Sequence, residues 1–176
     1  MPEPRGCEIK PARIEDLPKI AELAGKIWRA SYPGMISPEQ IEFMLEWMYN
    51  LKALRTELES GVCFDQLFVG DTLIGFASYG PEAGEMKLHK LYIDPDRQRH
   101  GYGSQLLAHV EQRSAELGFR TLVLGVNKRN TRAISAYEKN GFRIRASVVN
   151  EIGNGFVMDD YIMEKVLPQA VQSFGS

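Results

Sequence analysis

The sequence lacks most of what several large classes of protein require. Among its 176 residues there are only two cysteines, Cys7 and Cys63, and their separation fits no metal-ligand motif. No apolar run approaches the roughly 20 residues of a membrane-spanning helix, and Met1–Arg5 lacks the charged and then apolar order of a signal peptide. We therefore expect a cytoplasmic protein with reduced thiols, no bound metal and no membrane partner.

An excess of charge of one sign is also missing. The 21 Lys and Arg residues nearly balance the 23 Asp and Glu residues, which leaves a formal net charge of -2. No global basic field therefore favours a nucleic-acid partner. With 44% hydrophobic and 25% charged residues, the composition is that of an ordinary globular protein. It predicts a single domain over residues 1–176, with a core at about 7–167 and a short tail after 168.

The spacing of apolar residues switches between the periods of strands and helices. Strands are expected at 7–11, 63–69, 72–79, 85–93, 121–126, 142–149 and 156–166, with a loop at 80–84. Helices are expected at 15–30, from Ser37 with a further turn or two from Asn50 to Gly61, from Gly101 to Gly118, and at 130–140. The order β-α-α-β-β-β-α-β-α-β-β predicts an α/β (α+β) fold, with helices flanking a mixed, largely antiparallel sheet.

The stretch from Leu88 to Leu107 carries the strongest chemical signal. Its first six residues have the composition of a buried strand, Asp94-Pro95 ends that strand, and a glycine-containing turn leads directly into an amphipathic helix. A helix N-terminus presents unpaired amides and a positive dipole end to an anion, and glycine lets the backbone approach closely. Arg97 and Arg99 add positive charge. We therefore predict a pyrophosphate site here.

The form of the turn separates three kinds of phosphate loop. No Gly-x-x-x-x-Gly-Lys-Ser/Thr string occurs, and Leu106 stands where a dinucleotide fold would have its third glycine. The order Gln98-Arg99-His100-Gly101-Tyr102-Gly103 instead resembles the (Arg/Gln)-x-x-Gly-x-(Gly/Ala) signature of the GCN5-related N-acetyltransferases (GNAT family). In that family the loop binds the pyrophosphate of acetyl-coenzyme A.

A second motif supports the same resemblance. The segment from Leu124 to Phe142 resembles the family's strand-to-helix segment, which ends in Ala-x-x-x-Tyr-x-x-x-Gly-Phe. The match extends from near Cys7 to Lys165, so it implies a GNAT-like fold for nearly the whole chain. The short stretches 28–32 and 158–161 further resemble the bacterial polyamine N-acetyltransferase branch.

The resemblance implies an enzyme that uses acetyl-coenzyme A to acetylate a primary amine of a small molecule by direct attack in a ternary complex. It also implies a splay between the fourth and fifth strands, and a bulge near Asp94-Pro95 would fit it. The basic residues Lys128, Arg129 and Arg132 would either meet the 3'-phosphate or form a solvated edge. The implied cofactor contacts are Leu91, Tyr92, Ile93, Gln98, Arg99, His100, Gly101, Tyr102, Gly103, Ser104, Asn130 and Tyr137.

Three residues are candidates for proton transfer. Tyr137 is the candidate general acid, because a phenol is protonated at neutral pH, although it would serve equally as a core tyrosine. His89 is the candidate base, because imidazole titrates near neutrality, or else it only packs. Alternation along the strand places His89 on the face of Leu91 and Ile93, with Glu85 as the fallback base. His109 is expected on the helix surface, uninvolved in the reaction.

The acceptor site is less defined by the sequence. By the resemblance, Trp28, Tyr32 and Met35 form the substrate wall, and the acidic residues at 39, 42 and 46 would either favour a cationic amine or be a solvated helix face. A protein N-terminus or lysine, an amino acid or an antibiotic amine are alternative acceptors. A coenzyme A-binding sensor without turnover is the rival function, and Tyr137 argues against it. A homodimer is left open.

Overall fold

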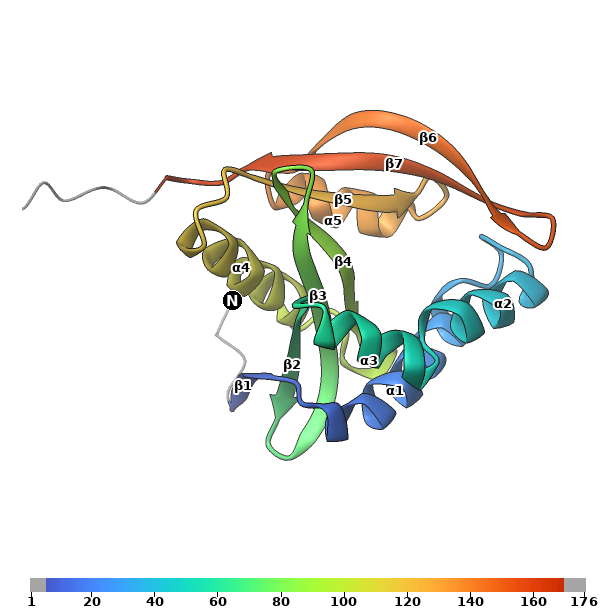
Figure 1. Ribbon diagram of the computed structural model, residues 1–176, viewed down its shortest axis with the longest axis horizontal. Helices are drawn as coiled ribbons and strands as arrows, with labels where there is room; N and C mark the ends of the chain where they lie inside the picture. The colour runs from blue at the N-terminus through green and yellow to red at the C-terminus, as the bar shows by residue number, and fades with distance from the viewer. Residues whose placement is uncertain (1–5, 170–176) are drawn as a thin grey trace, which may run out of the picture.

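The computed structural model describes residues 6–169, and these form one seven-stranded sheet flanked by five α-helices (Figure 1). Most of the expected tail after 168 lies outside the described residues, as does the segment 1–5. The strands are β1 Cys7–Pro11, β2 Cys63–Val69, β3 Thr72–Glu82, β4 Glu85–Ile93, β5 Thr121–Asn127, β6 Arg143–Gly153 and β7 Phe156–Val166. The helices are α1 Leu17–Ser31, α2 Pro38–Met48, α3 Leu51–Glu59, α4 Tyr102–Glu116 and α5 Thr131–Lys139.

The sheet is mixed, as expected, and its order is β1-β2-β3-β4-β5-β7-β6. All neighbouring strands are antiparallel except β4 and β5, which pair in parallel only over Met86–Leu88 and Leu122–Leu124. Beyond Leu88 the two strands separate, which agrees with the expected splay. The separation leaves one edge of β4 without a strand partner in the middle of the sheet.

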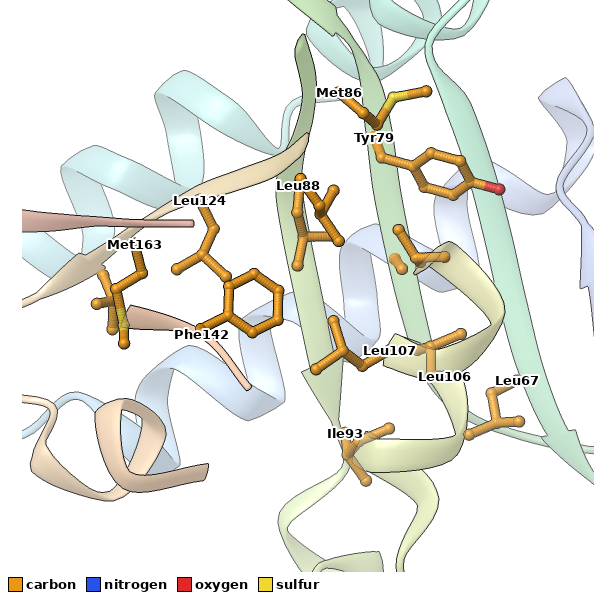
Figure 2. Close-up of a cluster of buried hydrophobic side chains, with 14 of the residues drawn as sticks. Leu67, Tyr79, Met86, Leu88, Ile93, Leu106, Leu107, Leu124, Phe142 and Met163 are labelled. Atoms are coloured by element: carbon orange, nitrogen blue, oxygen red, sulfur yellow. The ribbon is translucent and has the colours of Figure 1, made fainter. Parts of the chain in front are cut away.

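Each face of the sheet carries its own apolar core. On one face, the buried Leu106 and Leu107 of α4 lie over β3 and β4 and complete a cluster with Leu88 and Met163 (Figure 2). On the other face, α1 lies against β3 and β4, and α2 and α3 pack on α1, with the buried Ile20, Met44 and Leu54 among the residues clustered there. No helix of the described residues is long and apolar enough to cross a membrane.

The region between α2 and β2 contains one helix more than the predicted order. Asn50 caps α3, because its Oδ1 accepts a hydrogen bond from the Ala53 amide at 2.8 Å, and the buried Leu54 holds that helix to the core. The order with only two helices before the second strand is therefore wrong. The predicted helix start at Ser37 is confirmed, because the Ser37 Oγ caps α2 by accepting from the Gln40 amide at 3.1 Å, while the Gln40 side chain donates to the Val157 carbonyl at 2.8 Å.

The structure also corrects two predictions, one for the end of β3 and one for the position of the bulge in β4. Strand β3 continues to Glu82, so most of the expected loop at 80–84 is strand. Ser78 pairs with Lys90 and Tyr79 with Leu88, which makes His89 the extra residue of a β-bulge. The bulge therefore lies at His89 and not near Asp94-Pro95. It also reverses the alternation of β4, so the prediction that His89 shares a face with Leu91 and Ile93 is wrong.

Candidate active site

A cavity of about 670 Å³ opens where β4 and β5 separate. This volume lies in the usual range of small-molecule sites. The lining comes from both faces of the sheet: from α1 and α2 on one side, from α4 and α5 on the other, and from β4, β5 and β7 between them. Residues far apart in the sequence therefore share one space because two strands fail to pair.

The turn before α4 forms the basic end of the cavity. Gly101 has φ 80° and Arg99 has φ 67°, so the backbone winds in the left-handed region just before Tyr102 starts the helix. No side chain among the described residues caps α4, which leaves its first amides available to a ligand. Lys26 of α1 contacts Asp94 at 2.9 Å and Asp96 at 2.8 Å and holds the turn to α1.

Most of the predicted cofactor contacts line the cavity, either at its basic end or along β4. They are Leu91, Tyr92, Ile93, Gln98, Arg99, Gly101, Tyr102, Gly103, Ser104 and Asn130. His100 is exposed and does not line it. Of the basic cluster, only Arg132 lines the cavity, because Lys128 pairs with Asp159 and Arg129 reaches the Met35 carbonyl at 3.4 Å. Arg97 and Lys139 add to the positive charge at this end.

Strand β4 contributes its unpaired edge. Beyond Leu88 no strand occupies the β5 side of β4, so the peptide groups there open onto the cavity at Leu91, Tyr92 and Ile93. An extended ligand can pair with such groups as a further strand would. This edge suits the amide-containing arm of a ligand whose phosphates sit at the start of α4.

Tyr137 lines the cavity from α5, and its ring packs edge-on against Phe142 at 5.5 Å between centroids. Burial, and then the neighbouring Tyr32, raise the pKa of Tyr137 well above its ordinary value. The phenol is therefore protonated at neutral pH. No described residue hydrogen-bonds its hydroxyl, which is free to donate to a ligand. Asn130 caps α5 by accepting from the Ala133 amide at 3.1 Å.

The two candidate bases lie in different surroundings. His89 lines the cavity, but its Nε2 lies 3.7 Å from the position of a Cβ built on Gly80. Burial, and then Lys90 and Lys87, lower the pKa of His89. Glu85 does not line the cavity, and its carboxylate accepts hydrogen bonds from Arg145 at 2.9 Å. The geometry therefore brings only His89 to the site.

The opposite end of the cavity is aromatic. Trp28 stacks on Tyr32 with ring centroids 4.3 Å apart, and the Tyr32 and Tyr92 hydroxyls lie 3.3 Å from each other. Met35 is not part of this wall, because the turn after α1 directs the neighbouring Ile36 to the cavity instead. Met44, Met48 and Met158 complete the apolar surface.

The expected acidic face of α2 lies outside the cavity. Its residues 39, 42 and 46 do not line it, and Glu42 forms an exposed ion pair with Arg29 at 2.8 Å, as a solvated helix face would. The carboxylate that does line the cavity is Asp160 of β7, which the sequence reasoning missed. The doublet Asp159-Asp160 inside an apolar strand was the available signal, since alternation turns one of the pair inward.

Two other expectations concern residues outside the cavity. His109 lies on the helix surface only in part, since its side chain is 31% exposed and its Nε2 lies 3.2 Å from Asp65, whose carboxylate also accepts from Tyr79 at 2.6 Å. It stays away from the cavity, as expected. Both cysteines are free thiols that are partly buried against the core. Within residues 6–169, no three His, Cys, Asp or Glu side chains gather as metal ligands would.

Known proteins are similar to this chain in sequence and in architecture. Residues 20–142 match the model of the acetyltransferase (GNAT) family. The chain is 32% identical over 157 residues to the spermidine N(1)-acetyltransferase of Thermoplasma acidophilum, covering 86% of this chain and 95% of the relative. A crystal structure of the PaiA N-acetyltransferase of that organism in complex with coenzyme A superposes with a TM-score of 0.78 at 31% identity, over 91% and 98% of the two chains.

A further structure shares the fold at lower identity. The ribosomal-protein-S18-alanine N-acetyltransferase of Escherichia coli has a TM-score of 0.72 at 23% identity and covers 97% of this chain and 99% of its own. Two motifs in the sequence predicted this architecture: the turn before α4 and the segment around α5. Both occur in the fold that they indicated. The chain belongs to the GNAT acetyltransferase family and is an acetyl-coenzyme A-dependent N-acetyltransferase.

Proposed function

We propose that the protein transfers the acetyl group of acetyl-coenzyme A to a primary amine of a small cationic molecule, with polyamines as the first candidates, and that the amine attacks directly in a ternary complex. The observation that carries the proposal is the single cavity through the splayed sheet. The basic turn before α4, the phenol of Tyr137 and the aromatic wall of Trp28 and Tyr32 all line it. Both substrates would therefore meet in one space.

The cofactor contacts follow from the basic end. The pyrophosphate would bind the amides at the start of α4, beside Gly101 and Gly103, where no side-chain cap competes. Arg99 and Arg132 supply charge for the phosphates. The pantetheine arm would lie along the unpaired edge of β4, and the thioester carbonyl would receive a hydrogen bond from an amide there, at Leu91, Tyr92 or Ile93. Acetyl-coenzyme A supplies the thioester when bound.

Side chains of the protein would then donate and accept the protons of the reaction. A neutral amine attacks the carbonyl carbon, and the departing thiolate needs a proton, which Tyr137 is suited to donate because burial keeps its phenol protonated. His89 is the proton acceptor that the sequence suggested, and it lines the cavity whereas Glu85 does not. Direct attack needs no protein nucleophile, and neither Cys7 nor Cys63 lines the cavity.

The acceptor class rests on charge and on the relative. Faces of Trp28 and Tyr32 attract ammonium groups, and the lining beside them is otherwise largely apolar, as an aliphatic chain prefers. The 32% identical relative is a spermidine N(1)-acetyltransferase. A long, flexible polyamine would fit an extended cavity of this kind.

The deciding experiment is thiol release from acetyl-coenzyme A across a panel of amines. Spermidine, spermine and putrescine are compared with free amino acids, an aminoglycoside, and peptides that offer an N-terminal or a lysine amine. We expect saturable release with at least one polyamine, at a kcat/KM of about 10⁴ M⁻¹s⁻¹ or more. Preference for a peptide amine would mean that the acceptor is a protein N-terminus or lysine and not a small cationic molecule. Tight acetyl-coenzyme A binding without release for any amine would favour the sensor.

A further inference from the structure

Asp160 is a largely buried residue whose side chain lines the cavity. Only 8% of the residue is exposed, and within residues 6–169 it is the one acidic residue that lines the cavity between β4 and β5. Among the described residues no hydrogen bond or ion pair involves its side chain. Its neighbour Asp159 differs in each respect, since its side chain is 54% exposed and pairs with Lys128.

A buried carboxylate without a partner lowers the stability of the fold unless a cation or a hydrogen-bond donor compensates its charge. A buried, unpaired carboxylate is unfavourable, and proteins usually pair it or bind a cation to it. Burial, and then the negative charge of Asp159, raise the pKa of Asp160, while Lys128 and Lys87 act in the opposite direction. These two lysines do not form an ion pair with it. The position is therefore open to a cation that enters through the cavity.

The surroundings of Asp160 suit an ammonium group. On the adjacent strand β5, a Cβ built on Gly125 would lie 3.6 Å from Asp160 Oδ2, so the glycine leaves the carboxylate accessible. Tyr32, at the end of α1, is close enough for the charge of Asp160 to raise its pKa, after the larger effect of burial. Tyr32 in turn stacks on Trp28. A carboxylate beside aromatic faces is a typical ammonium site.

We propose that Asp160 binds the reacting amine in its ammonium form and accepts its proton before attack. The inference rests on the proposed function, since it names the group that prepares the acceptor in the same cavity. It gives this role to Asp160 rather than to His89, whose ring lies against Gly80 near Lys87 and Lys90. The carboxylate of Asp160 attracts an ammonium group by its charge, whereas the lowered pKa of His89 leaves its imidazole neutral at pH 7.

The proton balance is complete without a further reactant. The ammonium gives one proton to Asp160, and the freed nitrogen lone pair forms the N–C bond to the thioester carbonyl. The C–S bond then breaks, and the thiolate takes a proton from Tyr137. The second amine proton, lost as the amide forms, restores the Tyr137 phenol. Asp160 returns its proton to solvent, so one proton is released for each ammonium acetylated.

The test compares Asp160→Asn with the matched control Asp159→Asn. For spermidine at pH 7, we expect kcat/KM to fall by about 10²–10⁴-fold in Asp160→Asn and by less than about threefold in Asp159→Asn. The deficit should shrink toward pH 10, where the amine supplies its own free base. With 4-methoxyaniline, an amine that is already neutral at pH 7, the Asp160→Asn rate should stay within about threefold of wild type. Equal loss with both amines at every pH would make the role merely structural and overturn the proposal.

A binding measurement tests the same site without turnover. Calorimetry of spermidine with the coenzyme A-saturated protein should show affinity about tenfold or more lower in Asp160→Asn, and nearly unchanged in Asp159→Asn. Unchanged affinity in Asp160→Asn would overturn the inference even if the wild type is active. Absence of thiol release with every amine would instead refute the proposed function, and the binding comparison would still decide whether Asp160 is a cation site.

Discussion

The two ends of the cavity are built in different ways. One continuous segment, from β4 through the turn to the first residues of α4, forms most of the basic end, and α5 adds the charges of Arg132 and Lys139. The aromatic end combines residues of α1, α2, β4 and β7, which the chain brings together only in the folded sheet. A binding function held in one segment can be read from sequence order, whereas a site assembled from four elements depends on register and packing.

The difference has a consequence for substitution. In the proposed function, backbone amides bind the phosphates at the basic end, aided by the charges of Arg99 and Arg132, so changes at the glycines there act through the space they occupy. At the aromatic end and at Tyr137, the proposal assigns the proton, the charge and the ring surface to individual side chains. We therefore expect the largest effects on turnover from the second group, and effects on cofactor affinity from the first.

The largest expected effect is that of Tyr137→Phe. The variant keeps the ring on Phe142 but removes the proton donor, so turnover should fall by about 10²–10⁴-fold while acetyl-coenzyme A affinity changes little. Steady-state thiol release and calorimetry measure the two quantities. Tyr161→Phe, a change in a partly buried tyrosine that does not line the cavity, is the control. A Tyr137→Phe variant with wild-type turnover, when chemistry limits the rate, would leave Tyr137 a packing residue.

A smaller effect, confined to cofactor binding, is expected at Gly103. A Cβ there would meet Ile93 Cγ1 at 3.7 Å, an ordinary contact, so Gly103→Ala should be tolerated with a loss of affinity below about tenfold. The branched side chain of Gly103→Val would reach into the space of the phosphates, and affinity should fall by about 100-fold or more. Calorimetry with acetyl-coenzyme A and thermal unfolding separate this loss from misfolding. Equal affinity in both variants would contradict the assigned phosphate position.

The sequence predicted the parts that local order determines. The strand, the glycine turn and the start of α4 were read from one stretch, and the helix caps at Ser37 and Asn50 follow from side chains that bond amides three residues on. What failed depended on pairing between strands. The bulge at His89 arises from the register of β3 against β4, and no pattern within β4 alone reveals it.

Two site residues show the same limit. Met35 has the chemistry of a wall residue, but the turn after Tyr32 puts Ile36 in the cavity instead. The doublet Asp159-Asp160 indicates that one of the pair turns inward, but the place of Asp160 at the cavity depends on strands β5 and β7 pairing beside the splay. The family resemblance supplied the predicted location of the cofactor, whereas the proposed acceptor residues required the folded arrangement.

The role of His89 is open to a direct comparison with Asp160. Because its pKa is lowered, His89 is already neutral at pH 7 and could act as a base over the whole neutral range. We nevertheless expect His89→Gln to reduce kcat/KM for spermidine by less than about tenfold, with no change in the shape of the pH profile, because Asp160 takes the proton. The measurement is thiol release from pH 6 to 10. A loss confined to neutral pH would return the role of base to His89.

The smallest expected effect is on stability, and its sign is opposite to that on activity. Burial raises the pKa of Asp160 in the folded state, so ionising this carboxyl disfavours folding. Asp160→Asn removes that penalty while keeping nearly the same shape. At pH 7 the variant should unfold at a temperature about 2–4 °C above wild type for each 1 kcal/mol of unfolding free energy gained.

This difference in unfolding temperature should depend on pH. It should be absent at pH 3, begin above the unfolded-state pKa of about 3.9, and grow until the carboxyl is ionised in the folded state as well. Asp159→Asn, which loses only an exposed pair, should change little. Scanning calorimetry at pH 3, 5 and 7 measures the difference. An Asp160→Asn variant less stable than wild type at pH 7 would mean that favourable contacts already stabilise the Asp160 carboxylate in the free enzyme, so that it is not an unpaired site for a cation.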